Sequence, residues 1–418
     1  MEIKLEDKYK LSKGTRFLTG AQALVRVPIV QARRDKQKNL NTACYISGYR
    51  GSPLGGYDQQ ILKNKKYLNE NNIYFQPGIN EELAATSLWG TQQVNLRKQD
   101  KYDGVFGIWY GKGPGVDRAG DALKHVNLAG TSKFGGVIAL MGDDHICESS
   151  TTSHQSEFAM IDAMIPFFNP SGVQEILDYG IIGIELSRKS GCWVGIKCVH
   201  DNVSSGATVD LDENRLKLTD VLSDNYPSEG LNIRLKDTAQ EKEYRLHHHK
   251  IKYVKEFCKI NNLNKIIFDS EKAKIGIIST GKSFLDTKLG LEKIGINEDV
   301  ANQVGIKFLK IAMPWPLEET IIEKFSENLE KIIVVEEKRS IIETQVKEIL
   351  FNKNLNIKVV GKNDENNNDL FLSSGALDPG DIGLKISEII NYLKLPDEVN
   401  NLSKKLKSLK EKTNSNIS

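Results

Sequence analysis

Short apolar runs that end at a glycine or a polar loop alternate along this chain with longer helix-like stretches. In the first half we interpret four of these runs as buried β-strands, at residues 42–47, 105–110, 136–141 and 193–199. Continuous apolar strands separated by helices are typical of a parallel sheet that helices cover on both faces. The pattern therefore predicts an α/β fold.

Glycine-containing or polar loops follow each of these predicted strands, at residues 48–56, 111–115, 142–145 and 200–201. In a parallel sheet, ligands bind beyond the carboxyl ends of the strands, where such loops lie. The sequence thus predicts that a ligand site of the first domain lies at this edge of its sheet.

The second half shows the same kind of pattern after a charged, helix-like stretch. Its predicted strands lie at residues 273–279, 308–313 and 332–336. The end of the chain is rich in lysine and asparagine, a composition that predicts disorder. We therefore expect a first domain at 1–235, a helical connector at 236–270, a smaller second domain at 271–395 and a disordered tail at 396–418.

Composition narrows the class of protein. A chain of 418 residues with 39% hydrophobic residues suggests two or three domains with real cores. The net charge of +2, from 57 basic and 55 acidic residues, gives no bulk attraction to nucleic acid or membrane. The first fourteen residues contain no apolar stretch typical of a signal peptide, and no apolar run approaches the length of a membrane span. We expect a soluble, cytoplasmic protein.

Five scattered cysteines contain no C-x-x-C pair, so they predict no iron–sulfur or zinc site and suit a reducing cytosol. Consecutive histidines at 247–249 point about 100° apart on a helix and cannot converge on one ion, which favours a solvated helix face. Asp143, Asp144 and His145, together with His154, offer oxygen and nitrogen ligands near a strand end. Divalent-metal sites usually need further ligands, so we assign no metal ligand from this motif.

Two helix starts carry candidate chemistry. Gly113 and Gly115 lie in a loop that enters a helix, where backbone N–H groups attract anions, but the spacing matches neither a P-loop nor a dinucleotide fingerprint. Asn80 is a helix cap followed by Glu81 and Glu82 in the first turn. From the residues alone, both acids are best interpreted as complementing the helix dipole.

Taken together and in order, these segments resemble the amino-terminal region of the indolepyruvate ferredoxin oxidoreductases, especially the long fused-chain form found in bacteria. The matching stretches are residues 18–26, 46–56, 78–81, 110–118, 142–145, 149–157 and 186–195, with looser matches at 310–317 and 334–338. The resemblance implies a parallel-sheet thiamine-diphosphate pyrimidine-binding domain followed by a smaller α/β domain similar to the carboxyl-terminal domain of transketolase.

The family oxidises a 2-oxoacid, typically an aryl pyruvate such as indolepyruvate, with coenzyme A, and passes electrons to ferredoxin. Its glutamate that hydrogen-bonds the thiamine aminopyrimidine ring, and so promotes deprotonation of the thiazolium C2, corresponds to Glu81. The resemblance therefore overrides the dipole interpretation for Glu81 but not for Glu82. It also implies cofactor contacts at Gly113 and Gly115 and substrate contact at Ser52. Arg50 nearby could add positive charge.

Two departures from the family pattern limit what this sequence supplies. The first departure is that it contains no Gly-Asp-Gly motif with following asparagines for magnesium diphosphate, no cluster cysteines and no gamma-type domain. The second is Glu148, which stands where a lysine is expected. The resemblance then implies that a complementary subunit shares the thiamine diphosphate and carries the magnesium and a 4Fe–4S cluster. A natural subunit, a fragment of a longer chain, a scaffolding paralogue and a subunit of another thiamine-dependent 2-oxoacid decarboxylase all remain open.

Overall fold

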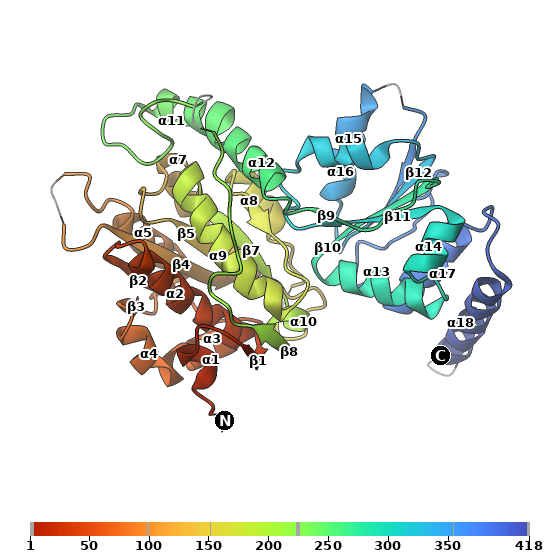
Figure 1. Ribbon diagram of the computed structural model, residues 1–418, viewed down its shortest axis with the longest axis horizontal. Coiled ribbons are helices and arrows are strands. Elements are labelled where there is room, and N and C mark those ends of the chain that lie inside the picture. The colour runs from red at the N-terminus through yellow and green to blue at the C-terminus, as the bar shows by residue number, and fades with distance from the viewer. Residues whose placement is uncertain (1–3, 98–99, 151, 223–225, 354, 416–418) are drawn as a thin grey trace. The chain divides into compact units, whose positions relative to one another are not determined.

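The apolar runs form the strands of two separate sheets in the computed structural model, which describes residues 4–97, 100–150, 152–222, 226–353 and 355–415 (Figure 1). The chain divides into two units, Met1–Asn261 and Asn262–Ser418. Each unit contains its own α/β sheet. The predicted fold class, a parallel-sheet domain followed by a smaller α/β domain, is confirmed. No helix in the described part of the chain is long and apolar enough to cross a membrane.

The first unit is built on a six-stranded sheet in which every neighbouring pair is parallel. Its strands, in spatial order, are β3 (Ile73–Phe75), β2 (Thr42–Gly48), β4 (Gly104–Lys112), β5 (Val137–Gly142), β7 (Val194–Cys198) and β6 (Phe167–Phe168). The four predicted strands are β2, β4, β5 and β7, and they occupy the centre. The shorter β3 and β6 form the edges and were not predicted, because two or three residues carry too little pattern.

Helices cover both faces of this sheet. They are α2 (Gly20–Gln37), α3 (Gly55–Lys63), α4 (Lys65–Asn69), α5 (Glu81–Thr91), α6 (Gly113–Arg118), α7 (Gly120–Ala129), α8 (Glu157–Asp162), α9 (Val173–Ser190) and α10 (His200–Val203). Helices α2 and α9 pack together, as do α5 and α7. A right-handed crossover puts its helix on one face when it moves along the sheet in one direction, and on the other face when it moves in the opposite direction. This double cover explains why the central strands are apolar along their whole length.

A short antiparallel ribbon completes the first unit. Strand β1 (Thr15–Thr19), which follows helix α1 (Asp7–Lys10), pairs with β8 (Gly206–Asp210), so that Phe17 lies opposite Thr208. These strands were not predicted, because their partners lie almost two hundred residues apart and each is largely exposed. The ribbon joins the beginning of the unit to the segment that follows β7.

A buried ion pair links four parts of the first unit. The Arg188 guanidinium on α9 donates to both oxygens of Asp35 on α2, each at 2.7 Å, and the side chains are 5% and 0% exposed. Asp35 also accepts from the Thr42 hydroxyl at 2.7 Å and from the Gln31 amide at 2.9 Å. Arg188 Nε donates to the Gly135 carbonyl at 2.8 Å. Two packed helices are thereby tied to the starts of β2 and β5.

The second unit has a five-stranded sheet in which one edge strand is antiparallel to its neighbour. Its strands, in spatial order, are β13 (Lys358–Val360), β12 (Lys331–Val335), β10 (Ile275–Thr280), β11 (Ile306–Ile311) and β9 (Lys265–Phe268). Its helices are α13 (Gly281–Lys293), α14 (Glu298–Val304), α15 (Glu319–Ser326), α16 (Ile342–Phe351), α17 (Pro379–Ile389) and α18 (Asp397–Ser415). The three predicted strands are the central ones.

Alternate residues of these central strands enter two different cores. Ile277 of β10 and Ile333 of β12 belong to one core, and their neighbours Ile278 and Val334 belong to the other. Side chains of a strand point alternately to opposite faces, so a strand buried on both faces must be apolar at every position. This requirement produces the continuous apolar runs in the sequence.

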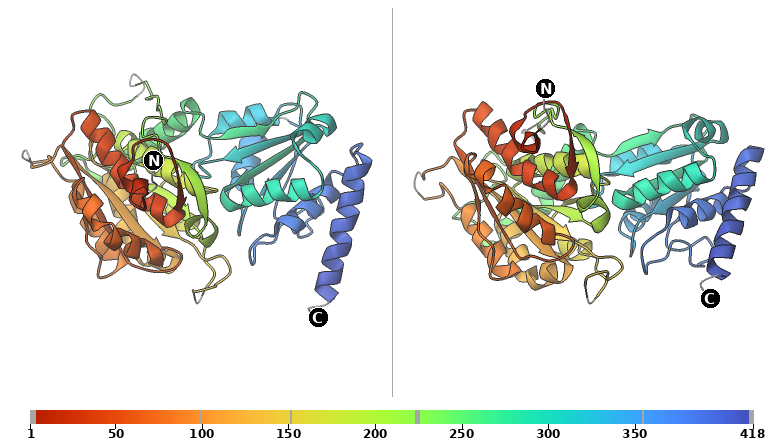
Figure 2. Two further views of the ribbon diagram at one scale, coloured as in Figure 1. Left: turned by 60° about the horizontal axis from the view of Figure 1, so that its bottom comes forward. Right: turned by 90° about the horizontal axis from the view of Figure 1, so that it is seen from below.

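Two boundary predictions need correction. The stretch predicted as a connector contains α11 (Ala239–Arg245), a π-helical turn (Leu246–Lys250) and α12 (Ile251–Ile260), all in the first unit, whereas β9 joins the second sheet. The prediction of a disordered tail is wrong for residues 397–415, which form α18 (Figure 2). Residues 416–418 of that prediction lie outside the described part.

The physical reason for α18 is a thin apolar stripe hidden among lysines and asparagines. Val399 is buried, and Leu402 and Leu406 are partly buried, a spacing of three and four residues that places them on one helix face. Lys410 lies 2.7 Å from Asp378, the residue that caps α17. The stripe and this ion pair hold the helix to the second unit.

We expect Asp35→Asn to destabilise the first unit by about 3–5 kcal/mol, because the buried Arg188 would lose its bidentate partner and keep only Glu185, at 3.7 Å. Urea unfolding followed by tryptophan fluorescence measures this, since Trp89, Trp109 and Trp193 all lie in the first unit.

The matched control is Lys124→Ala, which removes an exposed ion pair with Asp162 at 2.6 Å. It should cost less than about 1 kcal/mol, because solvent screens exposed pairs. A cost for Asp35→Asn as small as that of the control would contradict the structural role of the buried pair.

Candidate functional site

Loops from several strands meet at the carboxyl edge of the first sheet, as the sequence predicts. The N–H of Gly78, after β3, donates to the Gly48 carbonyl at the end of β2 at 2.8 Å. The N–H of Asp143, after β5, donates to the Cys198 carbonyl at the end of β7 at 2.8 Å. Parallel strands all end at one edge, so these loops form one surface.

Glu81 is the first residue of α5 and points into this edge. The Asn80 side chain caps the helix by accepting from the Leu83 N–H at 2.9 Å, as predicted. The Trp109 indole N–H donates to the Glu81 carbonyl oxygen at 2.9 Å and fixes the backbone. Glu81 is only 6% exposed, yet no described residue donates a hydrogen bond to its carboxylate or pairs with it. A buried carboxylate without a donor is costly unless a ligand supplies one.

Glu82, by contrast, is exposed. It lies in the first turn of α5, where a negative charge complements the helix dipole. Adjacent residues of one sequence motif therefore have different surroundings.

The two candidate glycines approach other side chains closely. A Cβ atom added to Gly115 would lie 2.4 Å from Oε1 of Glu81, and one added to Gly113 would lie 2.1 Å from Cγ of His154. Any larger residue at either position must displace its neighbour. The helix that they begin, α6, has only six residues, so its dipole contributes little, and the anion-binding interpretation of this loop has no support from its length. Because these glycines have no side chain, Glu81 and His154 can lie close to the backbone of this turn.

His154 lies between two carboxylates beside this glycine turn. Its Nε2 is 2.9 Å from Asp117 on α6, and its Nδ1 is 3.7 Å from Asp143 after β5. The interaction with Asp143 raises the pKa of His154, burial opposes that rise, and Asp117 adds to it. Burial by itself would raise the pKa of Asp143, but hydrogen bonds from His154 and Ser156 and the charge of Lys197 hold it well below its usual value. His154 thus links the glycine turn to the end of β5.

A buried lysine and glutamate extend this network. Lys197, near the end of β7, pairs with Glu157 at the start of α8 and lies 3.9 Å from Asp143. Burial raises the pKa of Glu157, and the charge of Lys197 opposes the rise. Neither Lys197 nor Glu157 was predicted from the sequence as a site residue. A lysine within the apolar run 193–199 was the available signal, because a lysine is almost never fully buried without a partner.

Ser52 and Arg50 lie in the loop after β2, at the same edge of the sheet. Ser52 is partly buried and Arg50 is exposed. Burial raises the pKa of Asp58, and the positive charge of Arg50 is among the interactions that oppose this rise. The structure therefore brings both predicted substrate contacts to the edge that carries Glu81, on a loop whose Gly51 would collide with Lys112 if it carried a Cβ.

The candidate metal motifs make other contacts. Among described residues, no group of three or more His, Cys, Asp or Glu side chains is arranged to hold a metal ion. Asp144 accepts backbone N–H bonds from Glu148 and Ser149, and so shapes its own loop. The histidines at 247–249 lie on the π-helical turn, where His247 and His248 are exposed, as the helix-face interpretation predicts.

Solved structures share this fold. A 2-oxoglutarate:ferredoxin oxidoreductase from Magnetococcus marinus, solved with 2-oxoglutarate, coenzyme A and succinyl-CoA bound, matches with a TM-score of 0.64 at 12% identity, over 90% of this chain and 66% of that one. A split-gene transketolase, described as an inactive beta4 tetramer, matches with a TM-score of 0.51 at 12% identity, over 90% of this chain and 98% of that one. The fold is therefore that of the 2-oxoacid oxidoreductase and transketolase class.

Within this class, sequence comparison finds similarity to indolepyruvate oxidoreductases. The indolepyruvate oxidoreductase domain model matches residues 265–416. The indolepyruvate oxidoreductase subunit IorA of Methanothermobacter marburgensis is 24% identical over 363 residues, which cover 87% of this chain and 53% of that protein. The subunit IorA of Pyrococcus horikoshii is 26% identical over 356 residues, covering 83% and 49%. The chain is thus similar to indolepyruvate oxidoreductase subunits and spans about half the length of these relatives.

The raised pKa of His154 predicts a pH-dependent stability. Protonated His154 stabilises the native state fully below the ordinary histidine pKa, and this contribution is lost as the pH rises through the raised native value. In His154→Gln, the loss of stability relative to wild type should therefore be largest at low pH and shrink as the pH rises. Urea unfolding at a series of pH values measures it.

His125→Gln is the control, because His125 also lies beside an aspartate, at 3.4 Å from Asp121, but is exposed. Its difference from wild type should stay small at every pH. A His154→Gln difference that does not change with pH would contradict the bridge between the two carboxylates.

Proposed function

We propose that this chain supplies the pyrimidine-binding half of a thiamine diphosphate site in an indolepyruvate-type 2-oxoacid ferredoxin oxidoreductase. The observation that carries the proposal is the buried Glu81 carboxylate, to which no described residue donates a hydrogen bond, at the carboxyl edge of a parallel sheet. Sequence similarity to the IorA subunits and the shared fold support it.

The residues around Glu81 fit an aminopyrimidine ring. The carboxylate needs a donor, and the ring N–H of the protonated or imino form of the aminopyrimidine would provide one. Gly115 has no side chain, so the Glu81 carboxylate can lie directly against the backbone of α6 on that side. When bound, thiamine diphosphate supplies a nucleophilic carbon for the 2-oxo group and a store for the electrons released.

Glu81 accepts and holds a hydrogen bond at a fixed point. The Trp109 indole anchors its main chain, and the Asn80 cap begins the helix at that residue. Low exposure excludes water, which strengthens a hydrogen bond to the carboxylate. Gly113 and Gly115 complete the wall on the side of α6.

Ser52 and Arg50 are the proposed substrate contacts. The Ser52 hydroxyl can donate to the carboxylate of a 2-oxoacid, and the exposed Arg50 guanidinium adds positive charge to the same loop. Both lie after β2, next to the strand β4 whose end leads to Gly113. The 2-oxoacid would then enter from the edge of the sheet.

A complementary polypeptide holds the rest of the site in this proposal. Its share is the diphosphate end with magnesium and the 4Fe–4S cluster, because the printed sequence has no motif for either. Coenzyme A is the proposed co-substrate and ferredoxin the electron acceptor. The chain on its own should therefore bind thiamine diphosphate weakly, since ionic and metal bonds to the diphosphate supply much of the affinity.

In the assembled complex, we expect Glu81→Gln to lower kcat for 2-oxoacid-dependent ferredoxin reduction by about 10²–10⁴, because the acceptor at the ring is weakened. Thiamine diphosphate should remain bound, as measured by calorimetry. Glu82→Gln is the matched control and should change kcat less than about twofold, because its carboxylate is exposed.

Full activity of the Glu81→Gln complex would contradict the assignment of Glu81. Tight, magnesium-dependent binding of thiamine diphosphate to the isolated chain would contradict the divided site. A complex that forms but neither binds thiamine diphosphate nor oxidises a 2-oxoacid would support the scaffolding alternative.

Gly115→Ala tests this close approach by adding one methyl group. Its Cβ would lie 2.4 Å from Oε1 of Glu81, so the carboxylate must move. We expect kcat to fall at least about tenfold, as misplacement of a catalytic group does, with an unchanged circular dichroism spectrum. Gly120→Ala, which has open space around its Cβ, is the control and should keep full activity.

A further inference from the structure

A cavity of about 820 Å³ lies in the first unit at the edge of the sheet opposite to Glu81. Part of its lining directly precedes strands: Lys38 and Leu40 precede β2, and Lys133 and Phe134 precede β5. The end of α9, which leads to β7, completes it together with residues of 220–221 and 226–232 and with Tyr253 of α12. Residues that precede parallel strands gather at the amino edge of a sheet, so this cavity is separate from the site at the carboxyl edge.

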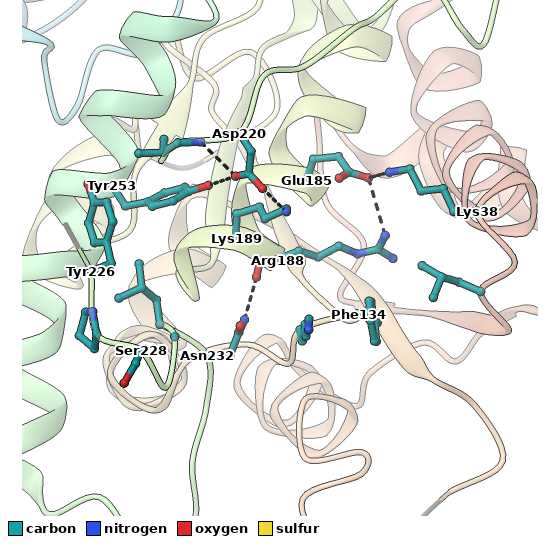
Figure 3. A pocket seen from close by; sticks show the side chains of 16 residues that line it. Lys38, Phe134, Glu185, Arg188, Lys189, Asp220, Tyr226, Ser228, Asn232 and Tyr253 are labelled. Atoms are coloured by element: carbon teal, nitrogen blue, oxygen red, sulfur yellow. Dashed lines mark hydrogen bonds and ion pairs between the residues drawn. The ribbon is translucent and has the colours of Figure 1, made fainter. Parts of the chain in front are cut away.

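Aromatic side chains form much of the wall. Tyr226 and Tyr253 make an edge-to-face pair with ring centroids 5.3 Å apart, and Phe134 lies on another side of the cavity (Figure 3). The Tyr253 hydroxyl donates to Asp220 at 2.5 Å, and the Tyr226 hydroxyl donates to Glu256 at 2.6 Å. These bonds hold both rings in place. Fixed rings present flat apolar faces on which a planar ligand can stack.

The charged lining is positive in sum. It holds the cations Lys38, Lys133, Arg188 and Lys189 and the anions Glu185 and Asp220. Arg188 is bound by Asp35. Lys189 is bound by Asp220, and Lys38 lies 3.6 Å from Glu185 (Figure 3). Lys133 is exposed, and its Nζ lies 5.5 Å from the Phe134 ring centroid.

Lys133 is therefore the cation left for a ligand, because no described carboxylate pairs with it. Asn232 adds an acceptor. Its amide nitrogen donates to the Arg188 carbonyl at 2.7 Å and to the Thr131 carbonyl at 3.1 Å, so the amide is held in one orientation. No described residue donates to its Oδ1.

We propose that this cavity binds a planar aromatic ligand that carries a negatively charged group, either a phosphate or a carboxylate. The volume lies within the range of small-molecule sites, roughly 300–1,000 Å³, and the lining combines apolar walls with a few polar groups, as such sites do. The ring stacks on the fixed aromatic side chains, the anion pairs with Lys133, and a ring donor reaches Asn232. The site is independent of the thiamine diphosphate proposal.

Calorimetric titration of the purified full chain tests the proposal. Adenosine monophosphate and indole-3-acetate are the anionic probes, and adenosine and indole-3-acetamide are their neutral counterparts. We expect saturable binding of one anionic probe, at least about tenfold tighter than its neutral counterpart and weaker at high salt. The probe that binds identifies phosphate or carboxylate as the charged group.

Lys133→Ala should weaken that binding about tenfold while leaving the melting temperature unchanged, because Lys133 is exposed. Lys101→Ala is the matched control. Its Nζ lies 5.1 Å from the ring centroid of the following Tyr102, the same sequence arrangement, but outside the cavity lining. It should bind the probe like wild type. Absence of saturable binding for both anionic probes, equal binding of the neutral ones, or full affinity in Lys133→Ala would overturn the proposal.

Discussion

The buried pair of Asp35 and Arg188 is the constraint on which the first unit depends. Two charges withdrawn from water are tolerable only when each is paired and its remaining hydrogen-bonding groups are used. Here the side chains of Gln31 and Thr42 donate hydrogen bonds to the Asp35 carboxylate, and the Gly135 carbonyl accepts a hydrogen bond from Nε of Arg188. Because the partners come from α2, α9 and the starts of two strands, the charges can be satisfied in only one arrangement of these elements. The pair therefore fixes how the helices lie across the sheet.

That arrangement gives the two edges of the sheet different characters. At the carboxyl edge, glycines bring backbone close to Glu81 and His154. At the amino edge, Arg188 borders a cavity with aromatic walls. One buried ion pair thus supports the sheet whose opposite ends carry the two proposed sites. Each proposed site offers different residues to a ligand because one lies beyond the carboxyl ends of the strands and the other beyond their amino ends.

Much of the fold could be predicted from the sequence, because burial on both faces leaves a local mark. The central strands of both sheets are apolar at every position, as Ile277 and Ile278 illustrate by entering different cores. Elements without such a mark were missed. Strands β1 and β8 exist only as partners of each other, β9 is an edge strand with a mixed pattern, and the apolar stripe of α18 is diluted by lysines.

For the site, the sequence alone determined that polar loops follow buried strands and that Asn80 begins a helix. The resemblance to a family selected Glu81 over Glu82, and the structure supplies a physical difference, since one carboxylate is buried and the other exposed. Only the tertiary structure decided that Gly115 lies against Glu81, that His154 joins Asp117 to Asp143, and that Lys197 is buried beside Glu157. Local pattern reports how each residue is buried, whereas these contacts join residues far apart in the chain and arise only when the sheet aligns the ends of its strands.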